Sequence, residues 1–261
     1  MRGRSATIVP VIVRQPRRNH LRSVPLARTE PVKSLLHLDS SYSGNSVSKH
    51  LTSLYADTWR ERHGALGYRY RDVAADPVPL VGPAYCALRR RLEGRDPVPV
   101  DEVAALAANA AEEREWASTR PLVTELLAAD TVLLGVPVHN LSVPASLKAW
   151  IDRVTVPGVF TDPATEESLL RDTEVVVVTA RGGRRTADFL EPYLLAHFGE
   201  LGVTDVRFVH AELTRAPDVP RPSRFQALGT ESLAAARLAV VELAQGFSSS
   251  VDSFDVSRIE P

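Results

Sequence analysis

The sequence predicts an α/β protein: a three-layer, doubly wound sheet of five parallel strands with helices on both faces. Short apolar runs with the composition of buried strands alternate along the chain with longer segments of helical periodicity. Right-handed crossovers between such strands favour the doubly wound arrangement. The length of 261 residues and the hydrophobic content of 44% suit one such domain with some decoration.

The first two predicted strands flank a helix. Ser34–Asp39 is a short apolar run that leads into turn-forming residues at 40–45. Apolar side chains then recur at helical spacing over 46–62, and Gly64 ends this helix. Tyr68–Val73 alternates in the manner of a second strand.

The middle of the chain combines an irregular segment with the third strand. Five prolines and two glycines between Pro77 and Pro99 predict a long surface excursion. Asp101 is a suitable N-cap for an alanine-rich helix that runs to about Ala129, with a break near Pro121. The third strand is expected over 132–136, followed by a helix over about 144–154.

The C-terminal half supplies the last two strands. Glu174–Thr179 is a β-branched run typical of a buried strand, and Asp205–His210 forms the final one. Helices are expected over about 187–200 and, with amphipathic spacing, over about 231–245. Five strands thus alternate with five helices.

Composition excludes several classes of function. The net charge is −1, and the body of the chain is mildly acidic, which argues against nucleic acid as the main partner. A single cysteine, Cys86, excludes an intramolecular disulfide and a cysteine-based metal cluster. Because no apolar run approaches 18 residues, no membrane span is expected. A cytoplasmic protein is the expectation.

The two ends of the chain differ from the predicted domain, which covers 33–247. Residues 1–32 are rich in arginine and broken by proline, which predicts a basic, disordered extension. Domain-like sequence begins after Val32, and valine codons can start bacterial translation, so we expect the natural product to begin there. The serine-rich residues 248–261 predict a frayed tail.

Three loops follow the first, third and fourth strands and should meet at one rim of the sheet. The first offers Ser41, Ser46 and Ser48 around Gly44 at the start of a helix. Hydroxyls and free amides at a helix N-terminus suit a phosphate, although helix capping needs the same residues.

The other two loops suit a flat ligand. Residues 137–141 end a strand at Pro137 and then present a ring side chain and an amide, which fits a heteroaromatic group. An ordinary strand-to-helix connection is the alternative. In the loop 180–183, Gly182 and Gly183 let the backbone approach a ligand, although a plain turn accounts for them equally well. Their joint placement favours one shared site.

Residues 33–213 resemble the FMN-dependent NADH azoreductase and quinone oxidoreductase family, a flavodoxin-like group of homodimers. The order and spacing of the motifs agree over some 180 residues. The matching stretches are 38–41, 46–48, 71–77, 137–141, 147–148, 179–183, 192–194, 202–209 and 211–212.

The resemblance implies a set of cofactor-binding residues. The FMN phosphate would be held by Ser41, Ser46, Val47 and Ser48, with Ser40 as the alternative to Ser41. The isoalloxazine ring would lie against Pro137, Val138, His139, Asn140 and Leu141. Its other edge would be closed by Ala180, Arg181, Gly182 and Gly183.

The chain departs from the family pattern at several of these positions. His139 stands where a tyrosine is frequent, and Leu213 stands where glycine is usual. His139 either donates a proton or hydrogen bond to the acceptor or packs against the ring face. Phe160 is either a substrate-contacting lid over the flavin or an interface or core residue, and the loop that follows it is atypical. Arg181 either neutralises the reduced flavin or pairs with a surface acid.

The implied activity is hydride transfer from NADH or NADPH to FMN N5, followed by reduction of a quinone or an azo compound. Donor and acceptor would share one stacking place, so ping-pong kinetics are expected. No nucleophile or metal is needed, which agrees with the absence of a catalytic triad or metal-ligand motif in the sequence. One alternative is a tailoring reductase that acts on a quinone-like aromatic natural product. Another is a non-catalytic, flavodoxin-type electron carrier.

Overall fold

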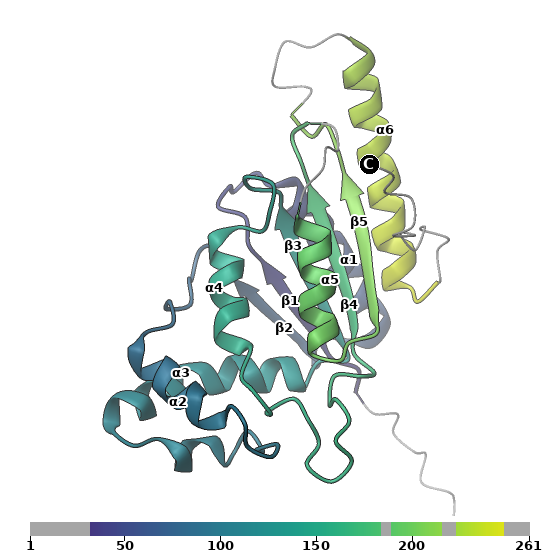
Figure 1. Ribbon diagram of the computed structural model, residues 1–261. Coiled ribbons are helices and arrows are strands. Elements are labelled where there is room, and N and C mark those ends of the chain that lie inside the picture. Colours follow the sequence, from purple (N-terminus) through teal and green to yellow (C-terminus); the bar gives the residue numbers. More distant parts are fainter. Residues whose placement is uncertain (1–31, 184–188, 216–222, 248–261) are drawn as a thin grey trace, which may run out of the picture. The chain divides into compact units, whose positions relative to one another are not determined.

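The computed structural model describes residues 32–183, 189–215 and 223–247. Its centre is a parallel five-stranded sheet with the strand order β2-β1-β3-β4-β5 (Figure 1). The strands are β1 (Leu35–Asp39), β2 (Tyr68–Asp72), β3 (Thr131–Pro137), β4 (Glu174–Ala180) and β5 (Asp205–Ala211). The predicted fold class is therefore confirmed. The predicted extension over 1–31 and the tail over 248–261 lie outside the described residues.

Helices cover both faces of the sheet. They are α1 (Val47–His63), α2 (Pro83–Leu92), α3 (Ala110–Leu127), α4 (Ala145–Val154), α5 (Leu190–Glu200) and α6 (Ser223–Ala244), with a short 3₁₀ helix at Val103–Leu106. Apolar side chains of α1 and α6 pack together on one face, whereas those of α3, α4 and α5 pack on the other (Figure 1).

Side chains of the central strands alternate between these two layers. On β3, Val132 and Leu134 belong to the cluster under α3, α4 and α5, and Leu133 belongs to the cluster under α1 and α6. Both faces are buried, so the strand is apolar throughout, as parallel strands in such folds are. Trp116 and Trp150 are likewise buried packing residues.

The segment 77–99 is not purely irregular, which corrects the prediction for it. It contains α2, whose first residue is Pro83, where the missing N–H costs no helical hydrogen bond. The buried Arg153 of α4 holds this segment, because its guanidinium donates to the carbonyl oxygens of Pro79 at 2.9 Å and Leu80 at 3.1 Å. The high proline and glycine content gave no sign of this helix in the sequence, because tertiary contacts stabilise it.

The boundaries of α3 also differ from the prediction. Asn109, not Asp101, caps the helix, because its Oδ1 accepts from the amides of Ala111 at 3.0 Å and Glu112 at 3.1 Å. The helix runs through Pro121 without a break. Pro121 is exposed, and so is Ala117, the residue whose carbonyl loses its helical partner.

The last two helices begin at different residues than expected. α6 starts at Ser223, eight residues before the predicted position. Gly229 and Thr230, which have weak helix propensity, precede the predicted start, so the sequence pattern did not indicate the earlier turns. α5 starts at Leu190, and the residues 184–188 that precede it lie outside the described parts.

A buried carboxylate fixes the junction between the sheet and α1. Asp39, the last residue of β1, is 1% exposed, and it accepts from Thr52 Oγ1 at 2.9 Å and from the Tyr70 hydroxyl at 3.0 Å. Burial, followed by the Asp39 carboxylate, raises the pKa of Tyr70 above its ordinary value, so this phenol stays a donor. Gly135 faces Asp39 in the register, and a Cβ there would lie 2.1 Å from Asp39 Oδ1.

Gly135→Ala is therefore expected to destabilise the protein by about 1–3 kcal/mol, because the added methyl displaces a buried carboxylate from its donors. Gly199→Ala is the matched control: a Cβ on this residue of α5 meets nothing within 4 Å. Urea denaturation of both variants measures the difference. Equal midpoints for the two variants would contradict the expectation.

His197 on α5 is a second group whose burial has a measurable consequence. Its Nε2 is buried and has no hydrogen-bond partner among the described residues. Burial, reinforced by the Lys148 ammonium, lowers the pKa of His197 to about 4. Between pH 4 and the ordinary histidine value near ~6.5, the unfolded chain binds a proton that the folded chain does not.

Stability should accordingly fall as pH drops from 7 to 5, and His197→Gln should remove part of this slope. Urea midpoints measured at pH 7 and pH 5 give the comparison. His50→Gln replaces an exposed histidine on α1 and should keep the wild-type slope. A variant of His197 with an unchanged slope would show that its burial does not govern the pH dependence.

Candidate functional site

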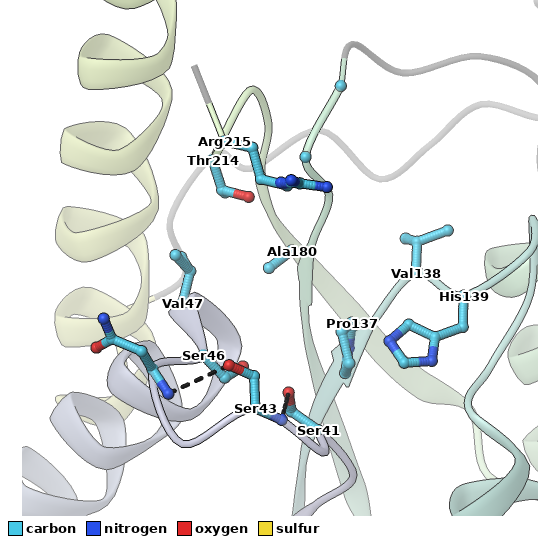
Figure 2. Close-up of a pocket in the computed structure, with 13 residues that line it drawn as sticks. Ser41, Ser43, Ser46, Val47, Pro137, Val138, His139, Ala180, Thr214 and Arg215 are labelled. Carbon is cyan, nitrogen blue, oxygen red and sulfur yellow. Dashed lines mark hydrogen bonds between the residues drawn. The ribbon is translucent and has the colours of Figure 1, made fainter. Parts of the chain in front are cut away.

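A cavity of about 690 Å³ lies at the carboxyl ends of the strands, among the loops that follow β1, β3, β4 and β5 (Figure 2). Sequence reasoning placed three of these loops at one rim, and the structure brings all three together. The loop after β5 is an addition to them. In a sheet of this order the reversal falls between β1 and β3, which is where such folds bind their ligands.

One end of the cavity is the N-terminus of α1. Ser46 caps the helix, and its Oγ lies 2.9 Å from Ser48 Oγ. Ser41 Oγ accepts from the Ser43 amide at 3.3 Å. The first-turn amides have no intrahelical acceptor, and the helix dipole adds positive potential. Hydroxyls and amides in this arrangement suit a phosphate group.

The structure separates the predicted serines by their position. Ser41 and Ser46 line the cavity, together with Ser43, Asn45 and Val47 of the same segment. Ser48 is fully buried and reaches the cavity only through Ser46. Ser40 is buried too, and its Oγ donates to the Gly135 carbonyl at 2.8 Å. Ser41 rather than Ser40 therefore faces the site, and its contact with FMN stays a prediction.

The loop after β3 forms the second wall. Its residues Pro137, Val138 and His139 line the cavity. The His139 ring stacks on Tyr42, with 6.1 Å between ring centroids. Tyr42 was not predicted, because nothing local in the sequence links it to a histidine about a hundred residues away.

The predicted residues Asn140 and Leu141 do not line the cavity within this chain. Both have positive φ, at 47° and 68°, and form a tight turn closed by reciprocal backbone hydrogen bonds of 2.9 Å between His139 and Ser142. The turn holds the backbone from which the His139 side chain projects. Contact of Asn140 or Leu141 with a flavin stays a prediction.

The loops after β4 and β5 are joined edge to edge and form the third wall. The Arg181 amide donates to the Ala211 carbonyl at 2.9 Å, and the Leu213 amide donates to the Gly183 carbonyl at 3.0 Å. Ala180, Gly182 and Gly183 line the cavity as predicted residues, and Thr214 and Arg215 line it as well. Arg181 does not appear on the cavity wall.

Phe160 is placed in the hydrophobic core of this chain and not over the cavity. It is 4% exposed and belongs to the cluster under α3, α4 and α5. Within this chain Phe160 is a core residue and does not line the cavity. Its contact with a substrate stays a prediction.

Other kinds of site find no basis in the described residues. Within 32–183, 189–215 and 223–247, no group of three His, Cys, Asp or Glu side chains could hold a metal ion. Across these same residues, the structure contains no helix with the length and apolar character needed to cross a bilayer. Cys86 is exposed.

The residues present fit FMN. The end of the cavity at the N-terminus of α1 carries three serine hydroxyls, and the walls carry apolar groups from Val47, Pro137, Val138 and Ala180. A Cβ at Gly183 would meet nothing within 4 Å, so the backbone there is open to a ligand. None of the lining residues is a carboxylate, which would repel a phosphate. Fold and site together define a flavodoxin-like protein with a site for an anionic, aromatic nucleotide.

Comparison with known proteins agrees with this class. A family model described as a flavodoxin-like fold matches residues 33–230, and the chain belongs to this family. An FMN-dependent NADH:quinone oxidoreductase of Nocardia farcinica is 37% identical over 195 residues, covering 72% of this chain and 86% of that protein. FMN-dependent NADH:quinone oxidoreductase 2 of Xanthomonas euvesicatoria pv. vesicatoria is 41% identical over 194 residues, covering 70% and 85%.

The fold likeness extends to solved structures. The crystal structure of azoreductase from Bacillus anthracis str. Sterne superposes with a TM-score of 0.66 at 20% identity, over 82% of this chain and 100% of that one. The family resemblance indicated by the sequence motifs is confirmed.

Proposed function

We propose that this protein is an FMN-dependent NADH:quinone oxidoreductase. The observation that carries the proposal is one cavity with a serine-rich helix N-terminus at one end and apolar and glycine-bearing walls beside it. The chain that forms it is 37% and 41% identical to two enzymes of this name over most of their length.

The chain's own residues have binding and orienting roles. Ser41 and Ser46 hold the phosphate with the first-turn amides of α1, and Val138 and Ala180 exclude water from the ring. Gly182 and Gly183 let backbone groups approach the polar edge of the ring. When bound, FMN supplies the redox chemistry by accepting a hydride from the nicotinamide donor and passing reducing equivalents to the acceptor. NADH is the donor named for the relatives, with NADPH as the alternative.

His139 is the titratable side chain on the wall where an acceptor would stack. It either donates a hydrogen bond to the acceptor oxygen or packs on the ring face, held there by Tyr42. Donor and acceptor compete for one stacking place, which gives ping-pong kinetics. Azo compounds are a second acceptor class that the sequence motifs favour. The same resemblance supports a cytoplasmic homodimer.

Reconstitution with FMN and anaerobic addition of NADH test the proposal directly. The oxidised flavin absorption should appear on binding and bleach with NADH alone, and a quinone should restore it. A flavodoxin-type electron carrier would bind FMN but would need a partner reductase before it bleached. Failure to bind FMN, or a spectrum that NADH leaves unchanged, would contradict the proposal.

Ser46→Ala should weaken FMN binding by about 10–100-fold, because a hydrogen bond to a charged phosphate contributes about 1.5–3 kcal/mol. Riboflavin lacks the phosphate, so its affinity should not change. The control is Ser53→Ala, an exposed serine on the same helix. Quenching of flavin fluorescence measures both ligands. Equal losses for FMN and riboflavin would assign Ser46 a structural role and not a phosphate contact.

A further inference from the structure

Arg215 follows β5 and extends its side chain along the cavity wall in a position that backbone geometry fixes. The Thr214 amide donates to the Arg181 carbonyl at 3.1 Å, and the Thr214 hydroxyl donates to the same oxygen at 3.0 Å. Leu213 adopts a left-handed conformation with φ 55° and is buried. This strained turn directs Thr214 and Arg215 towards the loop after β4.

The stem of Arg215 packs directly on Gly182. A Cβ at Gly182 would lie 2.8 Å from Arg215 Cδ and 3.0 Å from Cγ, so the two residues are in contact through a surface that only glycine provides. Figure 2 shows Arg215 on the side of the cavity away from Ser41 and Ser43, with Ala180 between them. The guanidinium therefore lies apart from the serine-rich end.

The residues that line the cavity include a positive charge but no negative charge. Arg215 is the only permanently charged side chain among the lining residues, and no carboxylate accompanies it. No ion pair or hydrogen bond joins its side chain to another residue in the described ranges. Arg181, one of whose two sequence-based interpretations was charge neutralisation, is not among the lining residues, whereas Arg215 is.

We propose that Arg215 compensates the negative charge that the flavin gains on reduction, an inference that rests on the proposed function. Hydride transfer from NADH brings two electrons and one proton, so the ring system gains one negative charge while the donor becomes NAD⁺. A cation on the wall beside the ring favours the reduced form over the oxidised form. Arg215 then raises the reduction potential of the bound cofactor and contributes little to the binding of oxidised FMN.

The test is the midpoint potential of bound FMN in Arg215→Gln, measured with the holoenzyme by dye-coupled reduction. The variant should bind reduced FMN about tenfold less tightly relative to oxidised FMN, which corresponds to a midpoint about 30 mV more negative for a two-electron couple. The affinity for oxidised FMN should stay close to wild type. Because Arg215 is exposed, high salt should shrink the difference between variant and wild type.

Two further variants separate charge from structure. Arg215→Lys keeps the positive charge and should restore most of the wild-type potential. Arg237→Gln removes an exposed arginine on α6 and should leave the potential unchanged. A wild-type potential in Arg215→Gln would overturn the inference. So would an equal loss of oxidised and reduced FMN with riboflavin binding unaffected, since Arg215 would then bind the phosphate.

The experiments distinguish an error in the role of Arg215 from an error in the proposed function. If the wild-type protein binds FMN and bleaches with NADH while Arg215→Gln keeps the wild-type potential, only the role of Arg215 is wrong. If the wild-type protein binds no FMN, the proposed function fails first, and the inference fails with it.

Discussion

The buried carboxylate of Asp39 is the constraint on which the cofactor end of the structure depends. A carboxylate at 1% exposure is tolerated only when donors satisfy it, and Thr52 from α1 and Tyr70 from β2 both do so. These two bonds fix α1 and β2 against the end of β1. Gly135 on β3 leaves the space that the carboxylate occupies. The N-terminus of α1, with its serine hydroxyls, is positioned as a consequence.

The remaining walls of the cavity are positioned by backbone hydrogen bonds between loops. The Val138 amide donates to the Ala180 carbonyl at 3.0 Å, which ties the loop after β3 to the end of β4. The loop after β5 is tied in turn to the loop after β4. Non-glycine residues with positive φ, among them Leu141 and Leu213, turn the chain at these places. Such conformations are costly and persist because the surrounding bonds hold them.

The sequence predicts what local pattern controls. All five strands lie within one residue of their expected bounds, because apolar runs in a sheet covered on both faces leave few alternatives. The helix α2 escaped prediction because contacts to Arg153, distant in sequence, stabilise a segment rich in proline. At the site, the chemistry of the serine and glycine loops was readable. The contact of Tyr42 with the His139 ring and the place of Arg215 on the cavity wall were not readable, since each depends on loops that are distant in sequence and meet only in the fold.

Two parts of the chain supply positive potential to the cavity: the N-terminus of α1 and the guanidinium of Arg215. In the proposed function, the N-terminus of α1 acts on a phosphate, whose charge is the same whether the ring is oxidised or reduced. Arg215 lies apart from that end, and in the role inferred for it the guanidinium acts on the ring, where the charge changes. An interaction that is equally strong with oxidised and reduced FMN changes only the affinity for the cofactor. An interaction that is stronger with one of the two forms also changes the reduction potential of bound FMN. If these two roles hold, separate loops supply the two contributions, and substitutions at one loop should change FMN affinity while substitutions at the other change the reduction potential.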